Sequence, residues 1–175
     1  MAGQGPESAL IVEVPAAEPA VARFRERLDS SAPLGVPAHI TVLYPFLPPA
    51  EIGPPVLAEL ERLFAAVSSF RFRLGRTAWF GQEVLWLAPG DPGPFSALTE
   101  RVFRAFPAFP PYGGQFEVVV PHLTVGDSQP LSDLRAAEES VRPCLPIDAH
   151  ATAVTLIIQR PGQKQWVKAA GFRLS

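Results

Sequence analysis

The sequence reads PAHITV at residues 37–42 and VPHLTV at residues 120–125. Each segment contains a histidine, an apolar residue, a threonine and a second apolar residue, with a proline shortly before the histidine. Side chains alternate between the two faces of a β-strand, so each segment would place an imidazole and a hydroxyl on one face and two apolar side chains on the other. We therefore expect the functional site to contain two His/Thr pairs: His39 with Thr41 and His122 with Thr124.

The segments around these motifs follow the same order in each half of the chain. Apolar spacing predicts strands at 9–14, 39–46 and 70–74 and helices at 21–28 and 57–67. It then predicts strands at 84–87, 116–125, 153–159 and 166–174 and helices at 95–106 and 131–141. This repetition predicts an α+β fold of two pseudo-symmetric lobes, with mainly antiparallel sheets, outer helices and a central cleft between the two motifs.

Length and composition set the limits of this interpretation. A chain of 175 residues with 47% hydrophobic and 18% charged residues fits one globular domain, which we place at 1–175 with halves at about 9–82 and 83–175. No apolar run is long enough to span a membrane, Met1–Ser8 does not resemble a secretory signal, and Cys144 is the only cysteine. We expect a cytoplasmic monomer. The net charge of −2 argues against a general nucleic-acid binder.

Two histidines that face each other suit phosphodiester cleavage without a metal or other cofactor. One imidazole removes a proton from the attacking water or hydroxyl, and the other protonates the leaving oxygen. Imidazole serves both roles because its ordinary pKa is about 6.5. Threonine hydroxyls can stabilise the charge that develops on the nonbridging phosphate oxygens.

Other interpretations of the same residues are weaker. His150 also fits His-x-Thr, but alanines flank it and its position has no counterpart in the other half, so we expect a structural or surface residue. The usual zinc-ligand sets, a Gly-x-Ser-x-Gly elbow and a P-loop are all absent from the sequence. The rival hypothesis from another class is a nucleotide-binding or sensor module that does not turn its ligand over.

The two motifs resemble those of the two-histidine phosphoesterases, which include 2′-5′ RNA ligase-like proteins and cyclic nucleotide phosphodiesterases. The resemblance covers nearly the whole chain and extends to Tyr44-Pro45-Phe46 after the first motif. It implies two lobes around a cleft, metal-free hydrolysis of 2′,3′-cyclic or related phosphodiesters, and no cofactor. It also implies that His39 and His122 are the acid–base pair, with His122 favoured as base, and that Thr41 and Thr124 bind phosphate.

One departure from the family pattern bears on the substrate. RNA-acting relatives often have a basic residue soon after the second motif, whereas Gly126-Asp127 follows here. With the acidic composition, this favours a small nucleotide or an RNA-end cyclic phosphate over strong polynucleotide binding.

The sequence offers three further candidates for substrate contact: Tyr44, Arg160 and Lys164. Strand alternation places Tyr44 on the face opposite His39 unless the strand kinks. We interpret Arg71, Arg73 and Arg76 as a solvated face. The aromatic residues near glycine-bearing loops are assigned to packing or to the rim of the cleft: Trp79, Phe80 and Tyr112.

Overall fold

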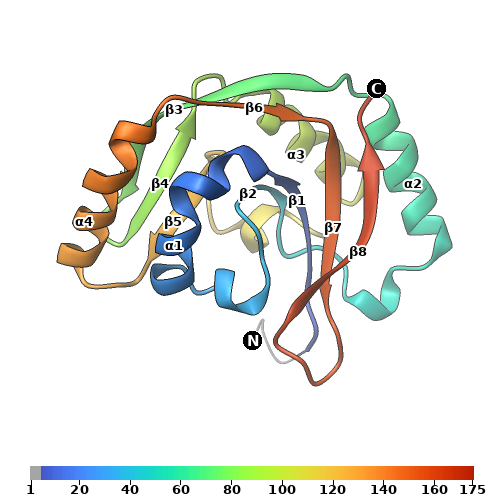
Figure 1. Cartoon of the computed structure of the whole chain (residues 1–175). Coiled ribbons are helices and arrows are strands. Elements are labelled where there is room, and N and C mark those ends of the chain that lie inside the picture. Colours follow the sequence, from blue (N-terminus) through green and yellow to red (C-terminus); the bar gives the residue numbers. More distant parts are fainter. Residues whose placement is uncertain (1–4) are drawn as a thin grey trace.

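The computed structural model describes residues 5–175, which form two four-stranded antiparallel sheets (Figure 1). Sheet A has the order β2 (His39–Leu43), β1 (Ser8–Glu13), β7 (Ala153–Gln159) and β8 (Trp166–Arg173). Sheet B has the order β5 (Leu123–Asp127), β4 (Val84–Pro89), β3 (Phe70–Phe80) and β6 (Ile147–Ala151). The predicted α+β architecture is confirmed, and each histidine motif lies at the edge of its sheet.

Within residues 5–175, four α-helices cover the sheets (Figure 1). Helices α2 (Pro54–Ala65) and α3 (Gly93–Ala105) contact β8 and β2 of sheet A. Helices α1 (Glu18–Leu28) and α4 (Leu131–Val141) contact β5 of sheet B. Each helix presents an apolar stripe, so each pair of helices buries one face of its sheet. These helices do not cover the opposite face of either sheet.

The two halves of the chain exchange elements. Strand β1 belongs to sheet A, but the helix α1 that follows it packs on sheet B. Conversely, β4 belongs to sheet B and the following α3 packs on sheet A. One further strand of each half also crosses over, since β3 pairs with β4 in sheet B and β7 pairs with β1 in sheet A. The predicted division near residue 82 therefore does not separate the two sheets.

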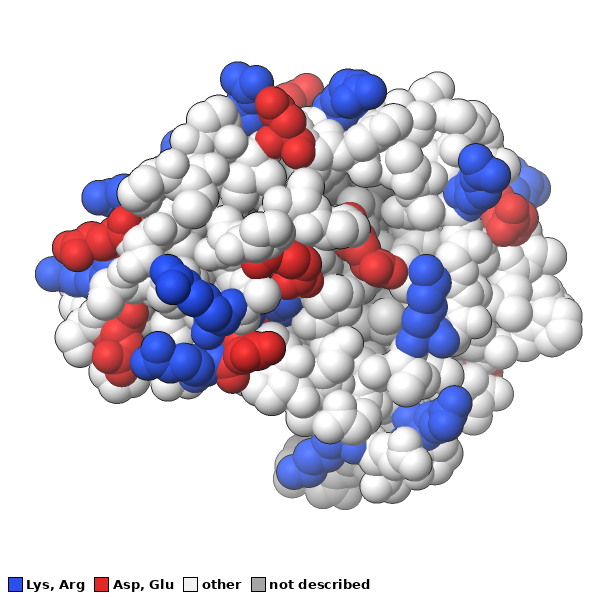
Figure 2. All heavy atoms as spheres, in the orientation of Figure 1, with Lys and Arg blue, Asp and Glu red and all other residues white. Residues whose placement is uncertain are grey.

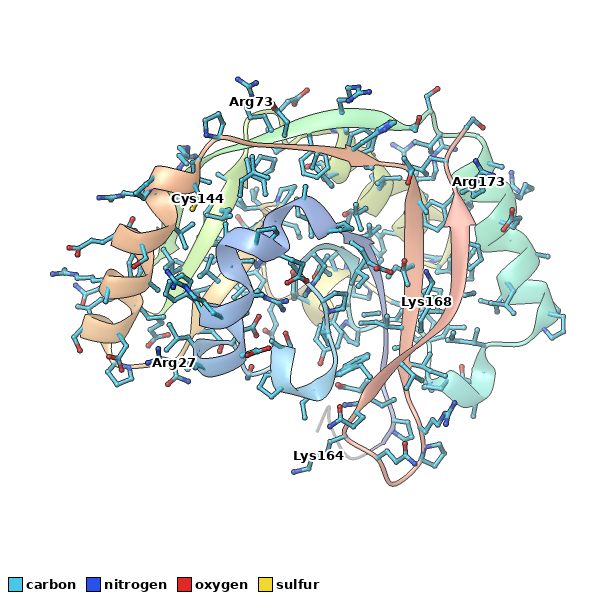
Figure 3. All side chains as sticks on the ribbon, viewed as in Figure 1. Arg27, Arg73, Cys144, Lys164, Lys168 and Arg173 are labelled. Carbon is cyan, nitrogen blue, oxygen red and sulfur yellow. The ribbon has the colours of Figure 1, made fainter. Side chains whose placement is uncertain are left out.

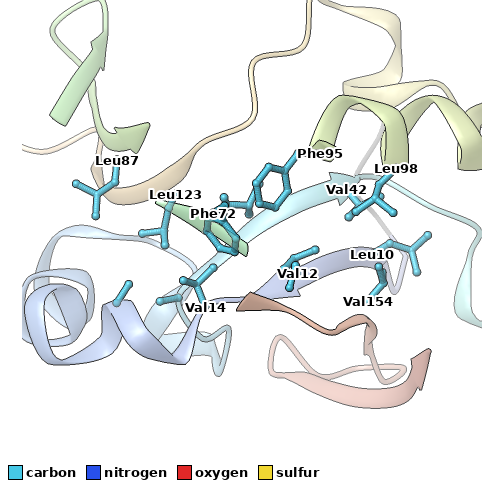
Figure 4. Close-up of a cluster of buried hydrophobic side chains, with 14 of the residues drawn as sticks. Leu10, Val12, Val14, Val42, Phe72, Leu87, Phe95, Leu98, Leu123 and Val154 are labelled. Carbon is cyan, nitrogen blue, oxygen red and sulfur yellow. The ribbon is translucent and has the colours of Figure 1, made fainter. Parts of the chain in front are cut away.

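A single large apolar cluster joins both sheets to their helices (Figure 4). It contains the apolar residues of both motifs, Ile40 and Val42 from β2 and Leu123 and Val125 from β5, all of them buried. This confirms the predicted alternation, because burial of these four side chains turns the intervening His and Thr side chains to the other face.

The structure differs from the sequence-based expectation at two strands. Residues 116–120 are not a strand: Phe116, Val118 and Val120 are exposed, and β5 begins only at Leu123, after Pro121, which has no N–H to donate. The second difference is β6, whose sequence IDAHA has few residues with high strand propensity and was not predicted. It forms because β3 extends far enough to give it a partner.

Candidate active site

The two predicted histidines lie on neighbouring sheet edges. His39 is the first residue of β2 and His122 directly precedes β5, and these two edge strands contact each other. The imidazoles are close enough that a protonated His122 lowers the pKa of His39. Both side chains are partly exposed, as are Thr41 and Thr124. The structure therefore brings the two halves of the predicted site together at the junction of the sheets.

The same backbone contact orients both imidazoles. Nδ1 of His39 lies 2.7 Å from the carbonyl oxygen of Pro37, and Nδ1 of His122 lies 2.8 Å from that of Val120. A carbonyl oxygen can only accept a hydrogen bond, so each Nδ1 carries the proton and donates. This fixes the tautomer in which Nε2 has the free lone pair. Both rings are thus set to exchange a proton through Nε2.

Burial lowers the pKa of both imidazoles. Loss of hydration lowers the pKa of His39 to about 4, although the hydrogen bond to Pro37 acts in the opposite direction. The nearby charges of Arg25 and Asp29 have opposing, smaller effects on the same pKa. Burial also lowers the pKa of His122, against the effect of its hydrogen bond to Val120. Each group would gain its proton most readily when an anion binds beside it.

Two aromatic rings enclose His122. Phe80 lies edge-to-face with the imidazole at 5.0 Å between centroids, Trp86 lies at 5.8 Å, and the two aromatic rings stack on each other at 4.7 Å. These contacts fix the plane of the ring. Trp86 was not a sequence candidate; it faces the site because it pairs with Thr124 across β4 and β5, and paired residues share a face.

A cavity of about 310 Å³ opens beside His39 and Thr41. Its apolar wall comes from a second, smaller apolar cluster on sheet A that includes Ile11, Ile157 and Trp166. Half-buried Thr41 and Tyr44 complete the lining near His39. A flat apolar wall beside hydroxyl and imidazole groups can hold a ring system next to a phosphate.

The expectation that Tyr44 faces away from His39 is wrong, and a β-bulge is the reason. Leu10 pairs with Leu43 and Ile11 pairs with Thr41, so Val42 is an extra residue in β2. The bulge reverses the alternation and brings Tyr44 to the face of Thr41. There the Tyr44 hydroxyl donates to Glu7 Oε2 at 2.8 Å, and burial with this contact raises the pKa of Tyr44 to about 12.

Tyr112 contacts the site from the segment between α3 and β5. Its backbone N–H donates to the carbonyl oxygen of Tyr44 at 2.6 Å. Burial raises the pKa of the Tyr112 hydroxyl, and the neighbouring Thr41 acts in the opposite direction. Its φ of 51° is uncommon for a residue other than glycine. Tyr112 therefore connects this segment to the end of β2.

The remaining sequence candidates lie elsewhere. Arg160 and Lys164 are exposed in the β7–β8 loop and do not line the cavity beside His39; Lys164 lies near the tip of the loop (Figure 3). His150 is exposed on β6, at the edge of sheet B farthest from β5, which confirms its interpretation as a surface residue. Trp79 lines a separate pocket with Arg135 and Glu138 of α4.

The two residues after the second motif have structural roles. A Cβ on Gly126 would lie 2.7 Å from Leu134 Cδ2 and 2.9 Å from Leu28 Cβ, so only glycine lets α4 and α1 approach β5 this closely. Asp127 accepts hydrogen bonds from the Ser30 backbone N–H at 3.2 Å and from its hydroxyl at 3.1 Å. The acidic residue therefore fixes the loop after α1 against sheet B.

The charged residues near the surface are of mixed sign. Figure 2 shows Lys and Arg interspersed with Asp and Glu over the face in view. Residues 5–175 contain no group of three or more His, Cys, Asp or Glu side chains placed to hold a metal ion. In the same range, no helix is both long and apolar enough to cross a membrane.

The family model of the 2′-5′ RNA ligase superfamily matches residues 12–163. The chain belongs to this superfamily. Both histidine motifs fall within the matched range, in agreement with the resemblance found in the sequence. No curated protein matches significantly.

Solved structures support the assignment of the fold. The chain is similar to Escherichia coli LigT complexed with NADP+, at 18% identity and a TM-score of 0.60 over 99% of each chain. It is similar to TT0787 of Thermus thermophilus, at 20% identity and a TM-score of 0.63 over 96% of this chain and 97% of the other. E. coli LigT complexed with 3′-AMP matches at 18% identity and a TM-score of 0.57, over 98% and 99% of the two chains.

Proposed function

We propose that the chain is a metal-independent phosphodiesterase that hydrolyses 2′,3′-cyclic or related nucleotide and RNA-end phosphodiesters. One observation carries the proposal: both imidazoles donate from Nδ1 to a carbonyl oxygen two residues earlier, on strands that lie edge to edge. Acid–base catalysis needs two groups that can each exchange a proton with the same substrate. Two neighbouring imidazoles, each with a free Nε2, meet this requirement. The nucleotides in the LigT structures, NADP+ and 3′-AMP, favour a nucleotide ligand.

In this mechanism one Nε2 takes a proton from water as the oxygen attacks phosphorus. The other Nε2 gives a proton to the departing ribose oxygen. The hydroxyls of Thr41 and Thr124 donate to the nonbridging oxygens as their negative charge grows.

Each assignment of the two roles has an argument in its favour. The family resemblance favours His122 as base and His39 as acid. The strongly lowered pKa of His39, which leaves it unprotonated at neutral pH, favours the reverse. A p-nitrophenolate leaving group needs little protonation, so this substrate should rescue the variant that lacks the acid but not the variant that lacks the base. Comparison of His39→Ala and His122→Ala on activated and ordinary substrates identifies the acid; equal rescue of both would contradict the two-role mechanism.

The deciding experiment measures turnover of nucleoside 2′,3′-cyclic phosphates in excess chelator, alongside binding of the corresponding monophosphates. We expect turnover to continue in chelator because protons and hydroxyl donors supply the whole mechanism. Binding without turnover would support the nucleotide-sensor hypothesis. Loss of turnover in chelator, restored by a divalent ion, would reject the proposed mechanism.

A further inference from the structure

A second pocket lies on the exposed face of sheet B, next to His122. Its volume is about 400 Å³, and its walls include Arg76, Trp86 and Ala88 together with Val120 and Pro121, the two residues before His122. Arg76 is the only charged side chain among its lining residues within the described range 5–175. The pocket is therefore positively charged and adjoins the proposed reaction centre.

A bulge in β3 turns Arg76 toward this pocket. Leu74 pairs with Pro89 and Arg76 pairs with Ala88, so Gly75 is the extra residue. Leu74 is fully buried in the core. Pro89, the partner of Leu74, and Ala88, the partner of Arg76, are adjacent in β4 and therefore point to opposite faces of the sheet. Arg76 thus lies on the face opposite Leu74, which is the face that carries the site. Arg76 is exposed, as its interpretation as part of a solvated face expects, and the bulge in addition places it in the lining of this pocket.

The register of three strands places Arg76 in line with His122. Trp86 pairs with Thr124 and Leu87 pairs with Leu123. Extending this register by one residue beyond the start of β5 sets Ala88 opposite His122, and Arg76 pairs with Ala88 on its other side. Neighbouring strands are about 4.8 Å apart, so the backbones of Arg76 and His122 are separated by roughly 10 Å. Ala88, whose side chain is small, lines the pocket together with Arg76 and with Val120 and Pro121.

Arg76 also differs from its neighbour Arg73 on β3 in having no acidic partner. Arg73 pairs with Asp148 at 2.7 Å, at the far end of the strand (Figure 3). No ion pair or side-chain hydrogen bond of Arg76 is found within residues 5–175. An exposed guanidinium in a pocket without acidic residues favours a phosphate, with which it forms charge-assisted, often bidentate, hydrogen bonds.

We propose that Arg76 binds a second phosphate of the substrate, so that the chain prefers a nucleoside 2′,3′-cyclic phosphate that also carries a phosphate at its 5′ position. This inference rests on the proposed phosphodiesterase function. The scissile phosphate lies between the histidines, and the second phosphate occupies the Arg76 pocket across Ala88. Arg76 contributes to substrate selection and takes no part in proton transfer.

The test compares adenosine 2′,3′-cyclic phosphate with and without a 5′-phosphate. The unmodified protein should show a KM at least about 10-fold lower for the 5′-phosphorylated substrate, since hydrogen bonds to a charged group contribute enough for a tenfold change. Arg76→Gln should abolish this difference and leave kcat for the unphosphorylated substrate unchanged. Arg76→Lys should retain part of it, because the charge remains. Arg71→Gln is the matched control: it removes an exposed arginine of the same strand that does not line the pocket.

The outcomes distinguish this inference from the function on which it rests. If neither substrate is turned over, the phosphodiesterase proposal fails. Equal KM values for the two substrates overturn the Arg76 inference and leave the phosphodiesterase proposal standing. A preference that survives Arg76→Gln, or that Arg71→Gln removes equally, also overturns it. Circular dichroism of each variant excludes a change of fold as the cause.

Discussion

At the scale of single residues, His39 and His122 share an arrangement that His150 lacks. The first two donate through Nδ1 to the backbone and lie at the junction of the sheets, whereas His150 is exposed on a distant edge. We expect His39→Ala and His122→Ala each to reduce kcat by roughly 10²–10⁴, the range for one acid–base group. The double variant should lose much less than the product of the two factors, because the groups act as a unit.

His150→Ala provides the control for this prediction. It removes the third histidine without touching the cavity or either motif, so its kcat and KM should match those of the unmodified protein. Steady-state kinetics on a nucleoside 2′,3′-cyclic phosphate compares the unmodified protein with the three single variants and the double variant. If His150→Ala is inactive and a motif variant is active, the assignment of the pair is wrong.

The pH dependence follows from the burial of both imidazoles. The reactive form carries a proton on one imidazole and none on the other, so kcat/KM should be bell-shaped. Because burial lowers both pKa values, His39 to about 4 from an ordinary 6.5, both limbs should lie on the acid side of 6.5. As the pH rises above both pKa values, the single proton is lost and kcat/KM falls. A kcat/KM profile with its maximum above pH 7, in protein shown to remain folded, would contradict this expectation.

The His/Thr pairs were predictable from the sequence because a period of two residues is enough to assign them to one face. The faces of Tyr44 and Arg76 were not, because each follows a bulge that reverses the alternation. A bulge depends on the pairing of two strands, and one strand's sequence does not contain that pairing. Trp86 was missed for the same reason: only its register with Thr124 places it beside His122.

At the scale of elements, Gly126 sets how closely two helices approach β5. A methyl group there would lie 2.7 Å from Leu134 of α4 and 2.9 Å from Leu28 of α1. Gly126→Ala should therefore lower the free energy of unfolding by about 1–3 kcal/mol, the usual cost of overpacking a core. Urea unfolding followed by circular dichroism measures this change.

Gly75→Ala is the matched control, since a Cβ at Gly75 would meet no atom within 4 Å. It also lies in a strand of sheet B, so any general cost of replacing a strand glycine appears in both variants. Equal unfolding free energies for Gly126→Ala and Gly75→Ala would show that the helices accommodate the methyl group by moving.

The helices were largely predictable from the sequence, but their placement was not. Helix α3 buries Phe95, Leu98 and Val102, the stripe that its sequence shows. The stripe does not indicate which sheet the helix covers. Helix α3 packs on sheet A, whereas the strand before it belongs to sheet B. At residues 116–120 the sequence predicted an element that does not form. Their β-branched residues favour a strand, but this part of the described chain has no partner strand.

At the scale of the whole molecule, the exchange of elements predicts one cooperative unit. Sheet A needs β7 and β8 from the end of the chain, sheet B needs β3 from the first half, and one apolar cluster spans both sheets. Neither sheet can unfold without exposing the apolar face of the other. We therefore propose that the chain is a single domain and expect two-state unfolding.

The tryptophans allow a direct test of this cooperativity. Trp166 lies in sheet A, and Trp79 lies in sheet B against α4. One variant keeps only Trp166 and another keeps only Trp79, with phenylalanine at the other tryptophan positions. In each variant the urea midpoint from fluorescence, which reports one sheet, should equal the midpoint from far-UV circular dichroism, which reports the whole chain. Comparison within each variant removes any effect of the substitutions on stability. If the Trp166 fluorescence and the circular dichroism of the same protein change at different urea concentrations, the sheets unfold separately and the exchanged strands do not couple them.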